Sequence, residues 1–376
     1  MNIVVVSDHY PSSRIPNKGA FVYNLIQELS RYHSITVIAP YKIHDLLKPK
    51  LKDGYGKENC VVHRPIYLSL SNKRIMGVNT KIYNRYFAEK AVSRCLRHLS
   101  FKPDLVYAHF LYNAMSCLSY VIKNRIPLVI ASGEAFYSGI LLKRGESFHI
   151  LNKHTNHFIC VSEINKKGLI ALGLDERKMS IIPNAVDYSL FKPMDKDICK
   201  EKLGISKQKF VVGFVGYFEH RKGPNRIIEA IKQLADDDIQ LVCVGGKEPL
   251  VSNNFTLTFP PIPNSQLPEI YNAFDIFVLP TLSEGHCNAI EEAKACCVPI
   301  VSSLGTSVEA QIDEKIGILV PPLDINEIAA AIKKLKTNKA LCLFMQKNLE
   351  EKRGENSIES RARTISDLLK SKVKNQ

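Results

Sequence analysis

Short runs of Val, Ile and Leu alternate with helical patterns along almost all of the 376 residues. Because most runs lack a polar residue at every second position, they are typical of parallel strands that are buried on both faces. The series restarts at Phe210, so we expect two doubly wound α/β domains with right-handed crossovers. The runs are residues 2–8, 34–40, 60–68, 104–110, 127–132, 158–162 and 180–184 in the first half, and 210–218, 239–246, 255–262, 276–282, 299–303 and 317–322 in the second.

A polar stretch at 185–209 indicates the connection between the two domains. We therefore place an N-terminal Rossmann-like domain at 1–187 and a C-terminal one at 188–356. Residues 357–376 have a helical pattern, which by itself leaves open whether this helix packs back on the N-terminal domain. Open α/β sheets bind ligands at the carboxyl ends of their strands, so we expect a ligand site in a cleft between two facing domains.

The composition is that of a globular cytosolic protein, with 45% hydrophobic residues. No stretch reaches the roughly 18 uncharged apolar residues of a membrane-spanning helix. The start, "MNIVVVSDHYP", lacks the basic segment and cleavage site of a secretory signal. Ten cysteines are present without a Cys-x-x-Cys motif, which favours reduced thiols in the cytoplasm.

Positive charge is concentrated in the first half of the chain. Residues 1–190 carry 26 Lys and Arg against 13 Asp and Glu, whereas residues 191–376 carry 25 against 24. A one-sided basic field attracts an anionic partner such as nucleic acid, an acidic membrane surface or an anionic substrate.

Two acids flank the expected start of a helix in "LPTLSEGHCNAIEEAKACC". A helix that begins near Asn288 would present free N–H groups to an anion, and Gly285 would let a ligand approach the backbone. From Glu284 to Glu292, eight helical residues span about 12 Å, which is about the separation of the two sugar rings in a nucleotide-diphospho-sugar. We expect Glu292 to accept from the ribose hydroxyls and Glu284 from those of the donor sugar. Glu291 needs no ligand, because an acid in the first turn favours the helix dipole.

A diphosphate also requires cations. Arg221, Lys222 and Arg226 cluster at a turn marked by Gly223, directly after the first strand of the second half. His109 ends an apolar run at the expected cleft, where a role in the site and a role in packing are equally open.

Several segments resemble those of glycosyltransferase family 4, whose members have the two-domain GT-B fold and include bacterial surface-polysaccharide enzymes. The resemblance covers nearly the whole chain. "EGHCNAIEEA" is similar to the Glu-x7-Glu motif of the family and is the most specific match. The other matching segments are "GYFEHRKGPNRIIEAI", "IIPNAVDYSLFKP", "KGAFVYNLIQEL" and "PDLVYAHF".

The resemblance implies retaining transfer of a hexose from a nucleotide-sugar, without a metal or another cofactor. It implies front-face attack, in which the departing phosphate helps to deprotonate the acceptor while the protein supplies positioning and charge stabilisation. The residues that it assigns to catalysis are Glu284, Lys222, Arg221 and His109. Those that it assigns to donor binding are Gly19, Gly216, Lys222, Glu284, Gly285, His286, Cys287, Asn288, Ala289 and Glu292.

Three positions depart from the family pattern. Tyr217 stands where an Arg often follows the glycine of the first C-domain strand, and Arg221 is its candidate substitute. Ser132 stands where a His often precedes glycine. Ala185 replaces a glycine in the linker signature, a change that the backbone should tolerate.

Other classes of protein fit less well. No Gly-x-Gly-x-x-Gly follows the first strand and no P-loop motif occurs. Asp236–Asp238, Asp195 and Asp197 are expected to be solvated surface charges rather than metal ligands. His154 and His157 are not accompanied by other candidate metal ligands in the sequence. A nucleotide-sugar epimerase of the same fold and a basic nucleic-acid-binding protein remain as alternatives, although no nucleic-acid recognition motif is present.

A basic segment in the first half suggests a membrane surface. Residues 72–102, "NKRIMGVNTKIYNRYFAEKAVSRCLRHLSFK", combine helical spacing with aromatic residues and eight cations: Lys73, Arg74, Lys81, Arg85, Lys90, Arg94, Arg97 and Lys102. A basic amphipathic helix can bind an anionic bilayer, so we expect a cytoplasmic enzyme that attaches to the inner face of the membrane and extends a lipid-linked saccharide. In the alternative, the aromatic residues pack on the sheet and the cations point into water.

Overall fold

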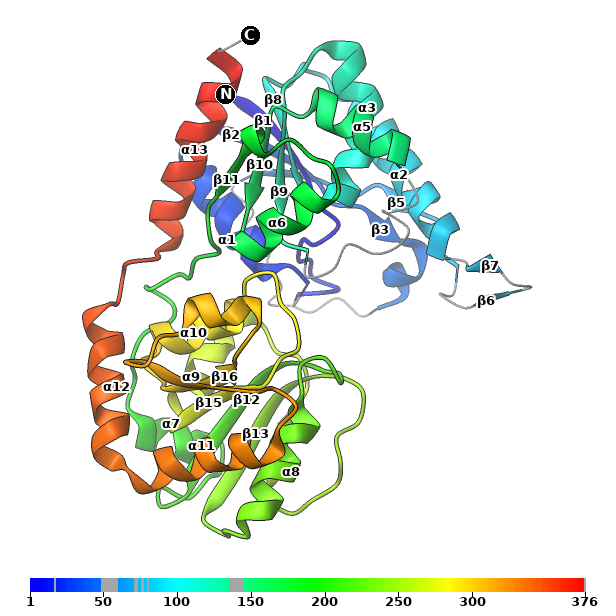
Figure 1. The fold of residues 1–376 in the computed structure, drawn as a ribbon. Helices are drawn as coiled ribbons and strands as arrows, with labels where there is room; N and C mark the ends of the chain where they lie inside the picture. Colours follow the sequence, from blue (N-terminus) through cyan, green and yellow to red (C-terminus); the bar gives the residue numbers. More distant parts are fainter. Residues whose placement is uncertain are drawn as a thin grey trace. The chain divides into compact units, whose positions relative to one another are not determined.

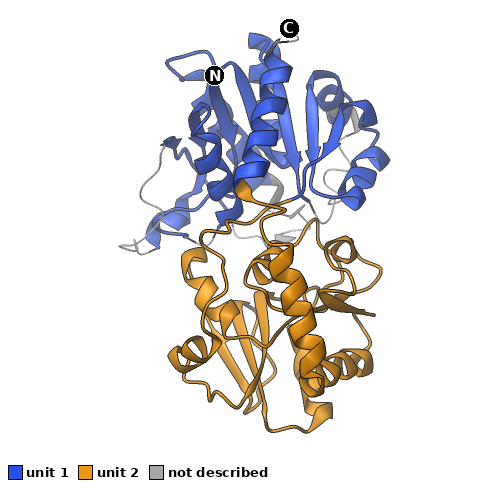
Figure 2. Ribbon diagram, turned by 90° about the vertical axis from the view of Figure 1, so that its left-hand side faces the viewer, with its two compact units in different colours: residues 1–183, 359–376 blue, residues 184–358 orange. Residues whose placement is uncertain are grey.

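The computed structural model describes residues 1–16, 18–48, 60–70, 74–75, 78–79, 81–134 and 145–374 (Figure 1). The chain forms two compact units (Figure 2). Unit 1 comprises residues 1–183 and 359–376, and unit 2 comprises residues 184–358. The chain thus passes from one unit to the other four residues before the expected boundary at 187, and its C-terminal segment belongs to unit 1.

Unit 1 is built on a seven-stranded parallel sheet with the strand order β11-β10-β9-β8-β1-β2-β4. Its strands are β1 (Asn2–Val6), β2 (Ser34–Ile38), β4 (Val61–His63), β8 (Leu105–His109), β9 (Leu128–Ser132), β10 (His157–Cys160) and β11 (Met179–Ile181). Among the described residues, four two-residue strands lie outside this sheet, namely β3 (Tyr41–Lys42) paired with β5 (Ile66–Tyr67), and β6 (Arg74–Ile75) paired with β7 (Val78–Asn79).

Helices cover both faces of this sheet. They are α1 (Ala20–Leu29), α2 (Lys81–Arg97), α3 (Leu111–Asn124), α5 (Gly145–His154), α6 (Glu163–Ala171) and α13 (Ile358–Lys374), with the short 3-10 turns η1 (Ile43–Leu47) and η2 (Glu176–Lys178). Figure 1 shows α2, α3 and α5 on one side of the sheet and α13 on the other. A hydrogen bond of 2.9 Å between His33 Nε2 and Ser366 Oγ ties α13 to the end of α1.

Unit 2 has a six-stranded parallel sheet with the order β14-β13-β12-β15-β16-β17. Its strands are β12 (Phe210–Phe218), β13 (Ile239–Lys247), β14 (Thr256–Phe259), β15 (Ile276–Leu279), β16 (Ile300–Ser303) and β17 (Gly317–Val320). Its helices are α7 (Lys196–Lys202), α8 (Pro224–Leu234), α9 (Leu267–Asn272), α10 (Asn288–Ala295), α11 (Ile325–Thr337) and α12 (Lys339–Glu351), with 3-10 turns η3 (Asn264–Gln266) and η4 (Ser307–Gln311).

Both sheets therefore have the strand order of the doubly wound fold, in which the order reverses beside the first strand. Ligands of such sheets bind outside the carboxyl ends of the strands at this reversal. In unit 1 the reversal lies between β1 and β8, and in unit 2 between β12 and β15.

Every long apolar run contains a strand, and α10 begins at Asn288 as predicted. The interpretation of 185–209 as a mere connection was wrong. This stretch contains α7, and Phe191 is 1% exposed within the hydrophobic core of unit 2. Its apolar side chains are too widely spaced to form a periodic pattern. The sequence therefore did not predict that this stretch contributes to the core. In the described ranges, no helix is long and apolar enough to cross a membrane.

Candidate active site

Two cations and a carboxylate meet at the strand reversal of unit 2. The turn after β12 carries Arg221 and Lys222, and the loop after β15 carries Glu284. Glu284 Oε1 lies 2.8 Å from Arg221 Nη1 and 3.0 Å from Lys222 Nζ. Glu219 accepts a second bond of 2.7 Å from Arg221 Nη2. The structure thus brings together three residues predicted to act in catalysis.

Both cations keep their charge. Burial alone would lower the pKa of Lys222, but the neighbouring Glu284 outweighs burial and raises it. The pKa of Arg221 is raised in the same way, because Glu284 and Glu219 outweigh the effect of its burial. A partly buried pair of permanent cations is the environment that a diphosphate requires.

Two glycines lie at neighbouring strand ends beside these cations. Gly216 has φ 153°, and a Cβ there would lie 3.0 Å from Lys222 Cδ. Gly245, at the end of β13, has φ 150°, and its Cβ would lie 1.8 Å from the carbonyl oxygen of Gly216. The close approach of the two strand ends therefore requires glycine at position 245.

The second acid of the pair, Glu292, lies on α10 in a different environment. Its Oε2 accepts from the Tyr271 hydroxyl and its Oε1 from Asn264 Nδ2, each at 2.9 Å. Burial raises the pKa of Glu292 to about 7, although both hydrogen bonds favour the charged form. No cation forms an ion pair with Glu292 within the described ranges, although the charge of Lys222 also favours the ionised carboxylate. A carboxylate outside an ion pair is suited to accept from ligand hydroxyls.

Hydrogen bonds from other segments of unit 2 fix the loop between Glu284 and Glu292. Ser307 Oγ donates to the carbonyl oxygen of Glu284, the Cys287 amide donates to Gln311 Oε1 at 2.8 Å, and Asn184 Nδ2 donates to the His286 carbonyl at 3.3 Å. The predicted donor residues from Gly285 to Ala289 therefore lie on a braced backbone.

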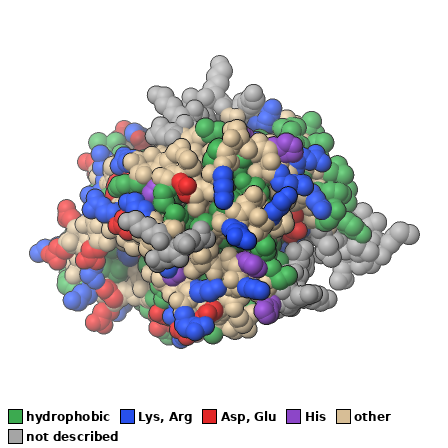
Figure 3. Space-filling view, turned by 90° about the horizontal axis from the view of Figure 1, so that it is seen from above, with side chains coloured by type: hydrophobic (Ala, Val, Ile, Leu, Met, Phe, Trp, Pro, Cys, Tyr) green, Lys and Arg blue, Asp and Glu red, His purple; other side chains and the backbone are tan. Residues whose placement is uncertain are grey.

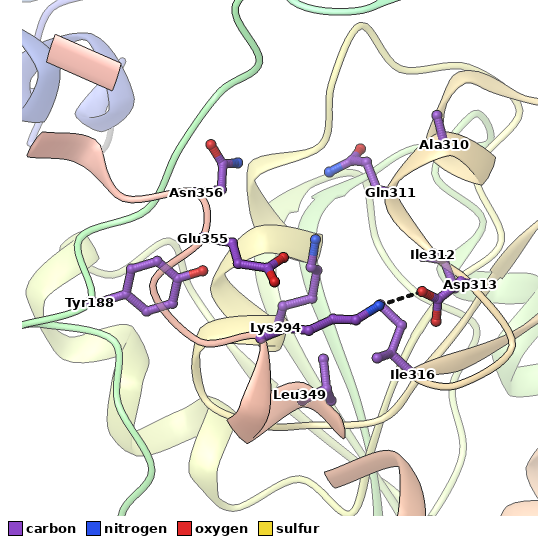
Figure 4. A pocket seen from close by; sticks show the side chains of 11 residues that line it. Tyr188, Lys294, Ala310, Gln311, Ile312, Asp313, Ile316, Leu349, Glu355 and Asn356 are labelled. Atoms are coloured by element: carbon purple, nitrogen blue, oxygen red, sulfur yellow. Dashed lines mark hydrogen bonds and ion pairs between the residues drawn. The ribbon is translucent and has the colours of Figure 1, made fainter. Parts of the chain in front are cut away.

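Glu291 anchors this loop instead of facing a ligand. It is 2% exposed and accepts from Gln311 Nε2 at 2.8 Å and from Asn356 Nδ2 at 3.3 Å. Gln311 and Asn356 also line a cavity of about 240 Å³ across which Lys352 pairs with Asp313 (Figure 4).

The predicted residues of unit 1 lie at its own strand reversal. His109 is 4% exposed, with its ring 4.7 Å from that of Tyr107. Burial, together with the nearby Arg361 and His9, lowers its pKa to about 3, so the imidazole stays neutral. Gly19 precedes α1 with φ 75°, and a Cβ there would lie 2.3 Å from the His9 carbonyl oxygen. Gly19 is thus required for the close approach of two backbone segments.

Some residues at the two sites were missed by the sequence analysis. Tyr271 and Asn264 hold Glu292, and no local pattern marks them. In unit 1, Asp8 and His9 follow β1 directly, and the adjacent acid and histidine in "VVVSDHYP" were the available signal.

No three His, Cys, Asp or Glu side chains are grouped to hold a metal ion in the part of the chain that the structure describes. Of the acids considered for metal binding, Asp195 caps α7 and Asp236 pairs with Lys336.

The chain is similar to known glycosyltransferases. The family profile described as Glycosyl transferases group 1 matches residues 195–359, and the profile described as Glycosyltransferase Family 4 matches residues 19–190. TuaC of Bacillus subtilis strain 168, described as a teichuronic acid biosynthesis glycosyltransferase, is 26% identical over 353 aligned positions, covering 88% of each chain.

A galactosyltransferase of Escherichia coli is 32% identical over 219 residues, covering 53% of this chain and 56% of that protein. Its name gives UDP-Gal as donor and α-D-GlcNAc-diphosphoundecaprenol as acceptor. Among solved structures, Anabaena HepE in complex with UDP and glucose superposes with a TM-score of 0.77 at 17% identity, covering 99% of this chain and all of that one.

The HepE comparison shows the fold, which is GT-B with two Rossmann-like domains. The two family profiles together span residues 19–359 apart from 191–194. The chain therefore belongs to the family 4 glycosyltransferases and is an enzyme of the hexosyltransferase type.

Proposed function

We propose that this enzyme transfers a hexose, with retention of configuration, from a nucleotide-diphospho-sugar to a saccharide or lipid-linked saccharide of a cell-surface polysaccharide. The observation that carries the proposal is the order of groups at the strand reversal of unit 2. Glu292, a carboxylate outside any ion pair of the described residues, suits ribose; the cations Arg221 and Lys222 suit a diphosphate; and Glu284 suits the sugar. The similarity to TuaC, of teichuronic acid biosynthesis, and to the galactosyltransferase with a lipid-linked acceptor supports the class of acceptor.

Donor binding is expected to replace the ion pairs that Glu284 forms with Arg221 and Lys222. Without a donor, this carboxylate occupies the cations that the diphosphate needs. A bound diphosphate takes over Arg221 and Lys222, and Glu284 is released to accept from sugar hydroxyls. This exchange preserves the number of charge-assisted bonds in the site while it makes one carboxylate available.

The same cations stabilise the departing phosphate during transfer. Negative charge grows on the leaving oxygen as the anomeric bond breaks, and preorganised cations stabilise it without a metal ion. Attack on the face from which the phosphate leaves gives retention.

Glu292→Ala is expected to weaken nucleotide-sugar binding about ten- to a hundredfold, because a hydrogen bond to a charged group is worth about 1.5–3 kcal/mol. Lys222→Ala should have a similar effect. Calorimetric titration with UDP-, GDP- and ADP-sugars in excess chelator measures both and identifies the donor. If both variants kept the wild-type affinity, the assignment of the donor site would be wrong. Interconversion of free nucleotide-sugars without transfer would instead favour the epimerase.

Nucleotide-sugar affinity is expected to fall about tenfold between pH 8 and pH 6, because protonation of Glu292, whose pKa is raised to about 7, removes the charge that accepts from ribose. The sign follows from the raised pKa: the carboxylate is charged above pH 7 and neutral below it. Glu292→Gln should make the same titration nearly independent of pH. A wild-type affinity that is constant over this range would contradict the ribose role.

We also propose that α2 attaches unit 1 to an anionic bilayer. Tyr83 and Tyr86 are 47% and 51% exposed, and Lys90, Arg94 and Arg97 lie exposed along the same stripe of the helix. Lys90 Nζ lies 5.3 Å from the centre of the Tyr86 ring. The two tyrosines are therefore exposed. The alternative, in which the aromatic residues pack on the sheet, does not hold for them. Figure 3 shows Lys and Arg among hydrophobic side chains on the right-hand part of its view, with few Asp or Glu.

The protein is expected to float with vesicles of anionic lipid at low salt and to be released at high salt. Reversal of Lys90, Arg94 and Arg97 to Glu should weaken binding by at least about a hundredfold, since each cation near the surface contributes about 1 kcal/mol. The matched control reverses Lys333, Lys334 and Lys339, which are exposed on unit 2. Equal flotation of the two triple variants would show that α2 does not bind the bilayer.

A further inference from the structure

An apolar strip is exposed on unit 1. It is formed by η1, which follows β3, and by the extended segment 66–70, which begins with β5 (Figure 1). Leu47 is 86% exposed, and the other members are between 40% and 53% exposed. The strip is defined by five side chains: Ile43, Leu47, Ile66, Leu68 and Leu70. Exposed apolar side chains that are grouped rather than scattered mark a surface that binds a partner.

The segment 66–70 has the polarity of an ordinary surface strand reversed. Ile66, Leu68 and Leu70 are exposed, whereas Tyr67 and Ser69 between them are half-buried. A strand at the surface of a globular domain normally turns its apolar side chains to the core and its polar ones to water. The reversed alternation is typical of a strand face that contacts lipid.

Hydrogen bonds join the two parts of the strip to each other and to α2. Ser69 Oγ and His44 Nδ1 lie 2.7 Å apart, which connects segment 66–70 to η1. The Leu70 amide donates to Asn84 Oδ1 at 2.6 Å, and Asn84 Nδ2 donates to the Leu70 carbonyl at 2.9 Å. The strip therefore continues into the first turn of α2, the helix proposed to bind an anionic bilayer.

The charges around the strip indicate its partner. Lys42 and Lys48 flank η1. The acid of η1, Asp45, is 5% exposed, and its Oδ1 lies 2.8 Å from Lys48 Nζ. Residues 60–70 include no acid. Protein interfaces are depleted of lysine, whereas an apolar face with a basic rim is typical of segments that lie in the membrane interface. The strip therefore fits an anionic bilayer better than a second protein.

We propose that unit 1 inserts this apolar strip into the boundary between headgroups and acyl chains of an anionic bilayer, with Leu47 as the most deeply buried side chain. The inference rests on the attachment proposed for α2 and not on the transfer reaction. The cations of α2 supply the long-range attraction, which salt screens. The strip then adds the apolar contact and fixes unit 1 at the depth where the head group of a lipid-linked saccharide lies.

The chain contains no tryptophan, so Leu47→Trp introduces a unique fluorescent reporter. At low salt, phosphatidylglycerol vesicles should shift its emission to shorter wavelength, because the indole leaves water. Lipids brominated near the start of the acyl chain should quench it more than lipids brominated near the end, since an interfacial segment lies only about 5–10 Å into the boundary. Leu343→Trp is the matched control, because Leu343 is exposed on α12 of unit 2, and it should show neither change.

A triple variant measures the contribution of the strip to binding. Ile43→Ser, Leu47→Ser and Leu68→Ser together should weaken partition into the same vesicles at least about a hundredfold, because three apolar side chains lose their contact with lipid. The matched control changes three exposed apolar side chains of unit 2: Leu323→Ser, Leu343→Ser and Phe344→Ser. Both variants should keep the thermal unfolding of the wild type, because exposed side chains contribute little to stability. Equal partition of the two variants would overturn the proposal.

The other outcomes separate this proposal from the preceding ones. A wild-type protein that does not float with anionic vesicles at low salt contradicts both the attachment by α2 and the insertion of the strip. A protein that floats while the emission of Leu47→Trp stays unchanged contradicts the insertion alone. Emission that shifts with protein concentration in the absence of vesicles would assign the strip to a second copy of the chain instead. None of these measurements depends on sugar transfer, so a failure of the transfer reaction leaves them unaffected.

Discussion

Glu284→Ala is expected to lower the turnover number of sugar transfer by about 100- to 1000-fold, while the Kd of the nucleotide changes by no more than about threefold. The carboxylate is proposed to contact the sugar at the reacting carbon, where the loss of one preorganised partner affects the transition state most. Arg221 and Lys222, which now pair with Glu284 at 2.8 and 3.0 Å, would remain for the diphosphate. Their affinity for nucleoside diphosphate should even rise slightly, because Glu284 no longer competes for them and only Glu219 still pairs with Arg221.

Steady-state kinetics and calorimetry on the same preparation separate the two quantities. Glu314→Ala serves as control, since Glu314 is an exposed acid of unit 2 outside the cluster. A Glu284 variant that lost affinity and kept its turnover number would place this residue in nucleotide binding alone. That result would exchange the roles proposed for Glu284 and Glu292.

Gly245→Ala is expected to destabilise unit 2 by about 3 kcal/mol or more, the combined cost of a strained backbone and of overpacking. A Cβ at this position would lie 1.8 Å from the Gly216 carbonyl oxygen, and φ there is 150°. The ends of β12 and β13 would have to separate, and Gly216 carries the turn that leads to Lys222. The variant should therefore lose donor affinity as well as stability, as measured by urea unfolding and by calorimetric titration.

Gly305→Ala provides the comparison. Gly305 has φ 72°, but its Cβ would meet no atom within 4 Å. Only the cost of the left-handed conformation remains, which is about 1 kcal/mol. Equal losses in the two variants would mean that the contact with Gly216 relaxes freely and that the close approach of the strand ends has no structural role.

Much of the architecture could be read from the sequence because the interactions that specify it are local. Runs of Val, Ile and Leu gave every strand of the two large sheets, since a strand buried on both faces has no polar side to interrupt it. The start of α10 at Asn288 and the place of the two acids around it followed from spacing along one short segment. Two-residue strands such as β3 and β6 have too few residues to form a pattern, and they were missed.

The sites themselves depend on contacts between distant segments. Tyr271 and Asn264 meet Glu292 from 21 and 28 residues away, and their hydrogen bonds favour its charged form against the burial that raises its pKa. Arg221 and Glu284 lie 63 residues apart and become partners only because β12 and β15 are neighbours in the sheet.

His9 and His109, at the strand reversal of unit 1, show the same division. The sequence determined that His109 ends a buried strand and that Asp8 and His9 follow another. Which of them is buried was decided by the tertiary structure, because Tyr107 and His109 lie on a sheet face that Arg361 of α13 also approaches, some 250 residues along the chain. Burial depends on what covers a face, and a covering element so distant in sequence leaves no trace in the local pattern of the strand that it covers.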